Sequence, residues 1–96
     1  MRSYECMVIA DPALDEDQLS ALVQRLSGII TTAGGSIEKA DNWGKRRLAY
    51  PIDGKGEGQY VLLQFQAEHA ATQELERIMR ITDGVVRYLL VRRDED

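Results

Sequence analysis

Two stretches with the periodicity of an amphipathic helix divide this chain of 96 residues, and segments with strand character flank each of them. In the first stretch, apolar residues from Leu19 to Ala33 recur at three- and four-residue steps, which places them on one helical face. The second stretch shows similar spacing between Ala71 and Met79. The flanking segments with strand character are 2–10, 36–52, 59–67 and 85–92. The predicted element order is therefore strand, helix, strand, twice over.

This order predicts the arrangement of the sheet. A strand–helix–strand unit has a right-handed crossover, and two interleaved units give the α+β ferredoxin-like fold, or split βαβ fold (βαββαβ). We expect a four-stranded antiparallel sheet with two helices on one face. The length suits one domain with one modest core. We therefore expect a single ferredoxin-like domain over residues 1–93, followed by a short acidic C-terminal stub at residues 94–96.

Local signals mark several boundaries of these elements. Asp15, with Gln18 three positions later, resembles a capping box at the start of the first helix. Gly34 and Gly35 follow the last apolar residue of that helix, where glycine accepts the left-handed cap conformation. The glycine-rich stretch Asp53–Gly58 predicts a hairpin turn between the second and third strands of the chain.

The long segment 36–52 has a fault in its alternation. Ile37 is odd-numbered, whereas the apolar residues near the end of the segment are the even-numbered Leu48, Tyr50 and Ile52. One face of a strand cannot hold both sets without an extra residue. Because glycine is the usual site of such an insertion, we predict a β-bulge at Trp43–Gly44. After it, we assign the even-numbered set to the core, which places Arg47 and Ala49 on the opposite face.

The sheet face away from the helices has no cover within this fold. Its predicted side chains are nevertheless largely apolar, namely Met7, Ile9, Tyr60, Leu62, Leu89 and Val91. An exposed apolar patch of this kind marks an interaction site. The pattern does not distinguish a second copy of the chain from a different partner.

Residues that would support catalysis or metal binding are sparse. Cys6 lies mid-strand, where a free cysteine is normally buried, and His69 stands alone at the entry to the second helix. The glycines of "GKGEG" precede a strand and lack the Lys-Ser/Thr of a phosphate loop. We expect no enzymatic activity, no catalytic residue, no metal, no cofactor and no small-molecule substrate. Neither a membrane span nor a secretory signal is evident, so we expect a cytoplasmic protein.

The densest run of positive charge, Lys45, Arg46 and Arg47, adjoins the single tryptophan, Trp43. Lysine and arginine contact phosphates, and tryptophan stacks on unpaired bases. The net charge of −4 argues weakly against a nucleic-acid partner, and a basic strand edge would equally well serve to discourage aggregation. Arg46 is even-numbered and so shares a strand face with Leu48, Tyr50 and Ile52. We therefore do not expect Lys45, Arg46 and Arg47 to act as one basic patch.

Four segments together indicate a family. "MRSYE", "WGKRRLAYPI", "GQYVLLQFQAE" and "RITDGVVRYLLVRR" resemble the bacterial small-subunit ribosomal protein S6 family, and the resemblance spans residues 1–93. It implies a non-catalytic constituent of the small ribosomal subunit with the ferredoxin-like fold. It further implies binding to the central domain of small-subunit (16S-type) rRNA, as a heterodimer with the neighbouring ribosomal protein S18. The setting would be cytoplasmic ribosomes, and an organellar ribosome fits as well.

The resemblance also suggests site residues. The candidate RNA contacts are Arg2, Lys45, Arg46, Arg47, Arg87, Arg92 and Arg93. The candidate contacts to the protein partner are Trp43, Leu48, Tyr50, Tyr60, Leu62 and Leu89. If the acidic side chains lie away from the RNA, the partner supplies much of the positive charge. We then expect weak RNA binding by this chain alone and tight binding by the pair.

Two other functional classes compete with this reading. One is a stand-alone ferredoxin-like dimeric module that binds a small ligand through its open sheet face. The other is a small cofactor-free enzyme on the same dimeric scaffold, which the lack of an evident acid–base pair disfavours. The basic run separates the first alternative from the ribosomal reading, because a ligand-binding dimer has no obvious need for it.

Overall fold

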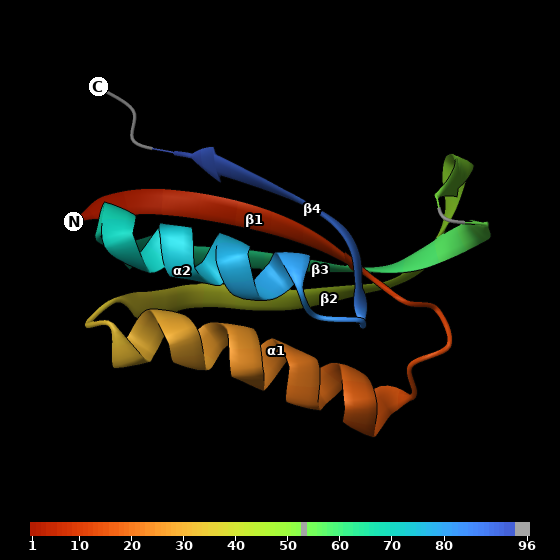
Figure 1. The fold of residues 1–96 in the computed structure, drawn as a ribbon, viewed down its shortest axis with the longest axis horizontal. Helices are drawn as coiled ribbons and strands as arrows, with labels where there is room; N and C mark the ends of the chain where they lie inside the picture. The colour runs from red at the N-terminus through yellow and green to blue at the C-terminus, as the bar shows by residue number, and fades with distance from the viewer. Residues whose placement is uncertain (53, 94–96) are drawn as a thin grey trace.

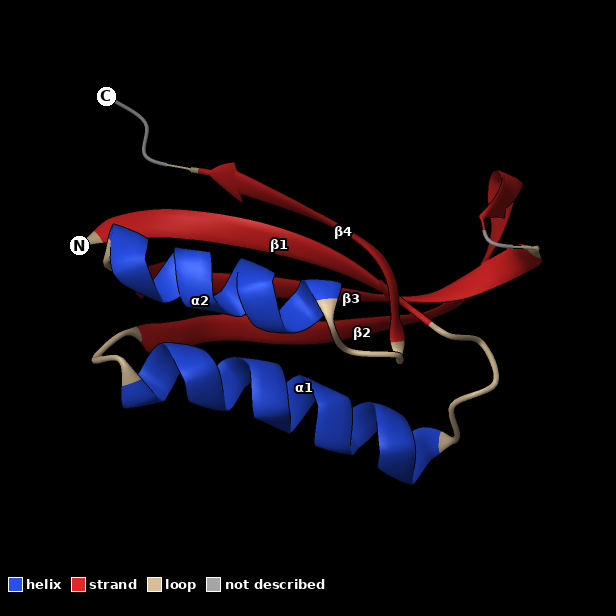
Figure 2. Ribbon diagram, in the orientation of Figure 1, coloured by secondary structure: helices blue, strands red, loops and turns tan. Residues whose placement is uncertain are grey.

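The computed structural model describes residues 1–52 and 54–93 and has the predicted element order. The elements are β1 (Arg2–Ala10), α1 (Glu16–Thr32), β2 (Ser36–Ile52), β3 (Lys55–Ala67), α2 (His69–Arg80) and β4 (Val85–Arg92). The strands form one antiparallel sheet in the order β2-β3-β1-β4, and both helices cover the same face of it (Figures 1 and 2). This is the ferredoxin-like split βαβ fold. The acidic stub at residues 94–96 lies outside the described residues.

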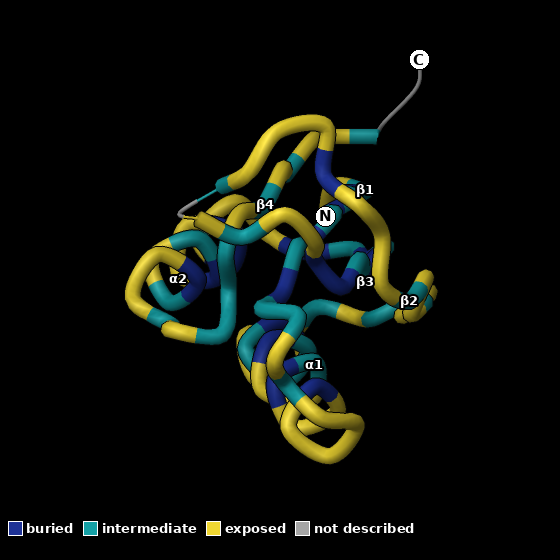
Figure 3. Tube along the Cα trace, turned by 90° about the vertical axis from the view of Figure 1, so that its right-hand side faces the viewer, coloured by how far each residue is buried: buried dark blue, intermediate teal, exposed yellow. Residues whose placement is uncertain are grey.

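The core lies between the helices and the sheet. Alternate residues of β1 and β3 point toward the helices and are buried, as the two-residue period predicts; they are Tyr4, Cys6, Val8, Ala10, Val61, Leu63, Phe65 and Ala67. Each helix buries the side that faces the sheet and exposes the opposite side (Figure 3). The rings of Tyr4 and Phe65 stack with their centroids 5.7 Å apart. Tyr4 is thus a structural residue.

Helix α1 begins with the predicted capping box. The Asp15 carboxylate accepts a hydrogen bond from the Gln18 amide at 2.8 Å, and the Gln18 side chain accepts one from the Asp15 amide at 2.9 Å. The helix ends at Thr32, and Gly34 follows with φ of 91°. At the next position, a Cβ on Gly35 would lie 2.5 Å from the Gln66 carbonyl oxygen of β3. Gly35 therefore lets the chain leave the helix directly against the sheet.

Replacing Gly35 with alanine is expected to lower the free energy of unfolding by about 2 kcal/mol or more, because the added methyl group meets backbone. Gly28, in the middle of α1, provides the matched control. A Cβ there meets nothing within 4 Å, so Gly28→Ala should raise the free energy of unfolding by about 0.5–1 kcal/mol. Urea denaturation of the two variants measures both values, and equal effects would contradict this account of Gly35.

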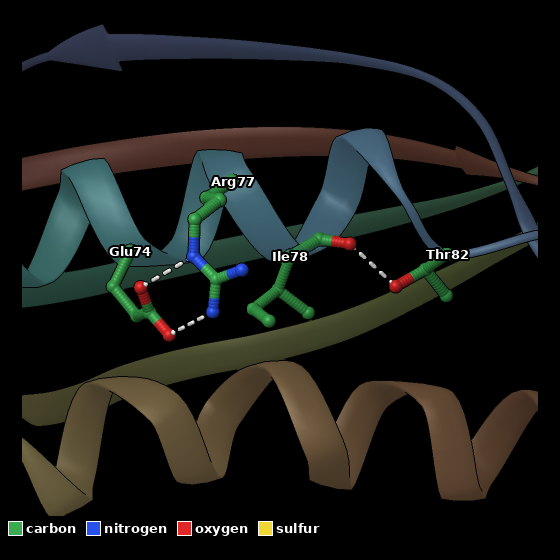
Figure 4. A network of polar contacts seen from close by, with 4 residues as sticks. All are labelled: Glu74, Arg77, Ile78 and Thr82. Atoms are coloured by element: carbon green, nitrogen blue, oxygen red, sulfur yellow. Dashed lines mark hydrogen bonds and ion pairs between the residues drawn. The ribbon is translucent and has the colours of Figure 1, made fainter.

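Polar contacts within α2 and just beyond it stabilise the helix (Figure 4). The Arg77 guanidinium donates two hydrogen bonds to the Glu74 carboxylate, at 2.9 and 2.8 Å, and these bonds lower the pKa of Glu74. The Thr82 hydroxyl donates to the Ile78 carbonyl, which also accepts a hydrogen bond from the Ile81 amide at 3.2 Å. Arg77 is thus committed to a partner on the outer side of the helix layer.

The β2–β3 hairpin is longer than predicted. β3 begins at Lys55, which pairs with Ile52, so the predicted turn Asp53–Gly58 was too long. Asp53 itself lies outside the described residues. Gly58 is a strand residue, and a Cβ there would lie only 2.3 Å from the Cγ2 of Ile9. The glycine leaves room for the Ile9 side chain of the neighbouring strand β1.

The predicted bulge at Trp43–Gly44 is confirmed. The β2–β3 register shifts between Asn42 and Gly44, Gly44 has φ of 82°, and its amide donates to the Asn42 side chain at 2.8 Å. Two further shifts, between Ile37 and Lys39 and between Arg47 and Ile52, were not predicted. The shifts at Ile37–Lys39 and Asn42–Gly44 each reverse which residues face the helices, so these two cancel between Gly44 and Arg47.

The assignment of the even-numbered residues of β2 to the core was therefore wrong. Ile37 packs against the core, but after the first two shifts the even-numbered Arg46 faces away from the helices, and the later even-numbered residues line a groove on that same side. Leu48 is buried on that open face, and Tyr50 is 61% exposed. Ile52 is half-buried on the same side of the sheet. The end of the hairpin consequently contributes to the open face rather than to the core.

Candidate protein and nucleic-acid interface

The open face of the sheet carries a groove with a volume of about 300 Å³. Its floor comes from β1, β3 and β4, and one wall comes from the end of β2. The lining residues are Met7, Ile9, Leu48, Ala49, Tyr50, Ile52, Tyr60, Arg87, Tyr88 and Leu89. Most of these side chains are apolar, which suits a groove that receives apolar side chains of another molecule.

The end of the hairpin reaches across the open face toward β4. It projects beyond the main body of the sheet and curls at its end (Figure 1). The Arg87 guanidinium donates a hydrogen bond to the Tyr50 hydroxyl at 3.2 Å, which joins β4 to β2 although two other strands lie between them in the sheet. Tyr50 and Leu89 remain 61% and 65% exposed on either side of the groove. The groove is therefore framed by the chain but not filled by it.

Four of the six predicted contacts to a protein partner line this groove: Leu48, Tyr50, Tyr60 and Leu89. Leu62 lies on the same sheet face opposite Met7 but is only 5% exposed, so it supports the groove from within. Trp43 lies outside the groove at the bulge, and its side chain is half exposed. The structure thus brings together all of the predicted set except Trp43.

The basic run of β2 is divided between the two faces of the hairpin. Lys45 pairs with Gln59, whose amide donates to backbone carbonyls of the loop before α1, so Lys45 and Arg47 lie on the helix side. Arg46 pairs with Gly58 on the open side, and its Nε donates to the Trp43 carbonyl at 3.4 Å. All three side chains are exposed. The expectation that they do not form one patch agrees with this placement.

The other predicted RNA contacts fall at two places. Arg87 lies on the rim of the groove, at the hairpin side of the sheet. Arg2 and Arg92 are exposed at the opposite end, near the start of β1. Arg93 lies at that end too, but it is only partly exposed. The seven predicted RNA contacts therefore form two separate groups.

Arg93 is engaged with carboxylates of its own chain. Its guanidinium lies 3.9 Å from Glu5 of β1 and 3.5 Å from Glu38 of β2. Glu38 also accepts a hydrogen bond from the Gln66 side chain at 2.9 Å. These contacts form a polar strip across the open face at the end away from the groove. These carboxylates reduce the positive charge that Arg93 has left for a phosphate.

A model of the family described as ribosomal protein S6 matches residues 3–92. The chain belongs to the ribosomal protein S6 family. A relative from Thermoanaerobacter pseudethanolicus, named small ribosomal subunit protein bS6, is 52% identical over 95 residues, which cover 99% of this chain and 100% of the relative. The protein of the same name from Desulforudis audaxviator is 48% identical over 94 residues, covering 98% of this chain and 100% of the relative.

The solved structures include a similar S6 fold. The crystal structure of ribosomal protein S6 from Thermotoga maritima superimposes with a TM-score of 0.90 at 35% sequence identity, covering 96% of this chain and 87% of that chain. The S6 family is a family of structural ribosomal proteins of the small subunit and not a family of enzymes. Membership therefore places the protein on the ribosome.

Cys6 and His69 are two potentially reactive side chains. Cys6 is fully buried, and burial, with a smaller contribution from the Glu76 carboxylate, raises the pKa of its thiol to about 12. The thiol is therefore protonated and shielded at neutral pH. His69 is exposed at the first position of α2.

Within residues 1–52 and 54–93, no three His, Cys, Asp or Glu side chains are grouped so as to hold a metal ion. A separate finding concerns membranes. In the same described ranges, neither helix has the length and apolar character required to cross a bilayer.

Proposed function

We propose that this S6-family protein is an RNA-binding structural constituent of the small ribosomal subunit. In this proposal it contacts the central domain of small-subunit rRNA, acts as a heterodimer with ribosomal protein S18, and works on cytoplasmic ribosomes through one domain, residues 1–93. The observation that carries the proposal is the match of the family model to residues 3–92. Relatives that align over their whole length bear the name of a small-subunit protein.

The groove supports a protein partner rather than RNA at the open face. Exposed apolar side chains such as Leu89 gain little from a phosphate backbone but are stabilised when another apolar surface covers them. Around the groove, Tyr50 and Tyr60 add large side chains of the kind enriched at protein interfaces. We therefore assign the groove to the partner protein.

The exposed basic side chains of the hairpin support RNA contact beside the groove. Lys45, Arg46 and Arg47 project from the hairpin, and Arg87 lies on the neighbouring rim. One carboxylate, that of Glu57, lies on the strand opposite Arg47, whereas the acidic pair Glu16 and Asp17 lies in the first turn of α1. A net charge of −4 nevertheless opposes RNA binding by the isolated chain. The partner then supplies the remaining positive charge, and RNA binds across both proteins.

Cosedimentation tests this function directly. The tagged chain, expressed in a bacterium, should travel with small ribosomal subunits through a sucrose gradient and remain with them after a high-salt wash. Release of ordinary phosphate-bound proteins by the same wash provides the control for non-specific binding. Recovery of the chain only in the soluble fraction would contradict the ribosomal role and favour the alternative of a stand-alone ligand-binding dimer.

A further inference from the structure

The two edges of the sheet differ in how well they can accept another strand. The β2 edge is interrupted by three register shifts, and its second half carries the basic run and Pro51. Bulges, lysines and prolines are the devices that block pairing at an edge. By contrast, β4 pairs with β1 without interruption from Arg87 to Arg92. The β4 edge is therefore the one suited to strand addition.

The hydrogen-bond pattern identifies which main-chain groups of β4 face outward. The Arg93 amide donates to the Ser3 carbonyl at 2.7 Å, so these two residues form a bonded pair of the antiparallel ladder. Bonded pairs recur at every second residue, which makes Leu89 with Met7 the same type of pair. The main-chain N–H and C=O groups of Tyr88 and Leu90 therefore point away from β1. Among the described residues, no strand pairs with β4 on that side.

Side chains on the open face of β4 define what an added strand would carry. Leu89 and Val91 are 65% and 44% exposed there. Arg87 lies on the same face, where its guanidinium donates to the neutral Tyr50 hydroxyl, and no carboxylate in the described part of the chain pairs with it. The strand itself, "VVRYLLVR", contains no acidic residue. The edge thus offers two apolar positions followed by an uncompensated positive charge.

We propose that the β4 edge binds an extended segment of another protein with the pattern apolar–x–apolar–x–acidic. The segment runs antiparallel to β4, like every other pair in this sheet, and its patterned residues lie opposite Val91, Leu89 and Arg87 in turn. These positions are the non-bonded pairs of the new ladder, in which side chains approach most closely. The intervening residues of the segment exchange main-chain hydrogen bonds with Leu90 and Tyr88.

Charge argues against a second copy of this chain as the occupant. Antiparallel pairing of two β4 strands would place Arg87 opposite a strand that holds no carboxylate. Within the described strand, neither guanidinium would gain a carboxylate from the other copy. An acid-bearing segment compensates it directly. This inference concerns strand addition at an edge and goes beyond the function proposed above, because it requires neither RNA nor an occupied groove.

The probe is a synthetic peptide in which threonines alternate with the three patterned residues, which are valine, valine and glutamate in that order. Amide hydrogen exchange of the full chain measures its binding. We expect slower exchange at the Tyr88 and Leu90 amides, with no change at Lys39 or Lys45 on the other edge. A peptide N-methylated at the threonines that face Tyr88 and Leu90 should not protect them, because it lacks the required donors. Replacing its glutamate with lysine should weaken binding about two- to fivefold.

Two variants separate charge recognition from other effects. Arg87→Glu should reverse the preference, so that the lysine peptide binds more tightly than the glutamate peptide. Tyr50→Phe removes the Tyr50 hydroxyl but should leave the preference unchanged. Equal binding by the N-methylated peptide, or protection confined to the β2 edge, would overturn the proposal. Concentration-dependent dimers that protect Tyr88 and Leu90 without peptide would overturn the choice of occupant.

Discussion

Replacing Leu89 with aspartate is expected to weaken binding of ribosomal protein S18 about thirtyfold or more. Leu89 is 65% exposed on the rim of the groove, so a partner that fills the groove covers it. The aspartate would place a charge in that covered surface, where it loses its water without gaining a partner. Isothermal titration of the purified chain with S18 measures the loss.

Ile81 provides a matched control for the Leu89 variant. It is 64% exposed, almost the same as Leu89, but it lies just after α2 on the helix layer of the molecule. Ile81→Asp should leave S18 binding unchanged. Both variants should alter the free energy of unfolding by less than about 0.5 kcal/mol, since neither side chain is part of the core. Equal loss of binding in the two variants would contradict the assignment of the groove to the partner.

The double substitution Arg46→Ala, Arg47→Ala is expected to weaken rRNA binding by the S18 complex roughly tenfold to a hundredfold. Both side chains are exposed on the hairpin, where each can reach a phosphate. The slope of log affinity against log salt concentration should fall in magnitude by about 1.4–1.8, corresponding to two lost phosphate contacts. Filter binding over a range of salt concentrations gives both values.

The single variants decide which face of the hairpin meets the RNA. Arg46 and Arg47 lie on opposite faces, so unequal effects would identify the RNA-facing side. Arg77→Ala serves as the control, because Arg77 is paired with Glu74 on the helix layer and should change neither affinity nor slope. An unchanged affinity and salt slope in the double variant would contradict RNA contact by Arg46 and Arg47 and would favour a solvated strand edge.

The strands β1 and β3 and both helices could be predicted because each carries a complete local signal. Strict alternation marks the buried side of β1, and Asp15 with Gln18 marks the start of α1. The β2 faces could not be predicted, because the first register shift has no such signal. It follows Ile37 at Glu38, where no glycine stands, so only the Gly44 shift was visible. The shift between Arg47 and Ile52 was also without a signal, and Tyr50 lies on the open face instead of in the core.

The apolar open face followed from the sequence, but the shape of the groove did not. Its wall depends on a contact between Arg87 and Tyr50, which lie 37 positions apart and on strands at opposite edges of the sheet. No local pattern encodes that approach. Likewise, the number of lysines and arginines could not show that Arg93 pairs with Glu5 and Glu38 of its own chain. Composition identifies candidate phosphate ligands, whereas the fold determines which of them keep their charge available.

The central claim is that RNA recognition is shared between this chain and its partner. A gel-shift assay with a fragment of the central domain of small-subunit rRNA tests it, using this chain alone, S18 alone and the two together at the same salt concentration. The account predicts weak binding by this chain alone and binding about tenfold or more tighter by the mixture. Binding by the isolated chain that is as tight as binding by the mixture would contradict it.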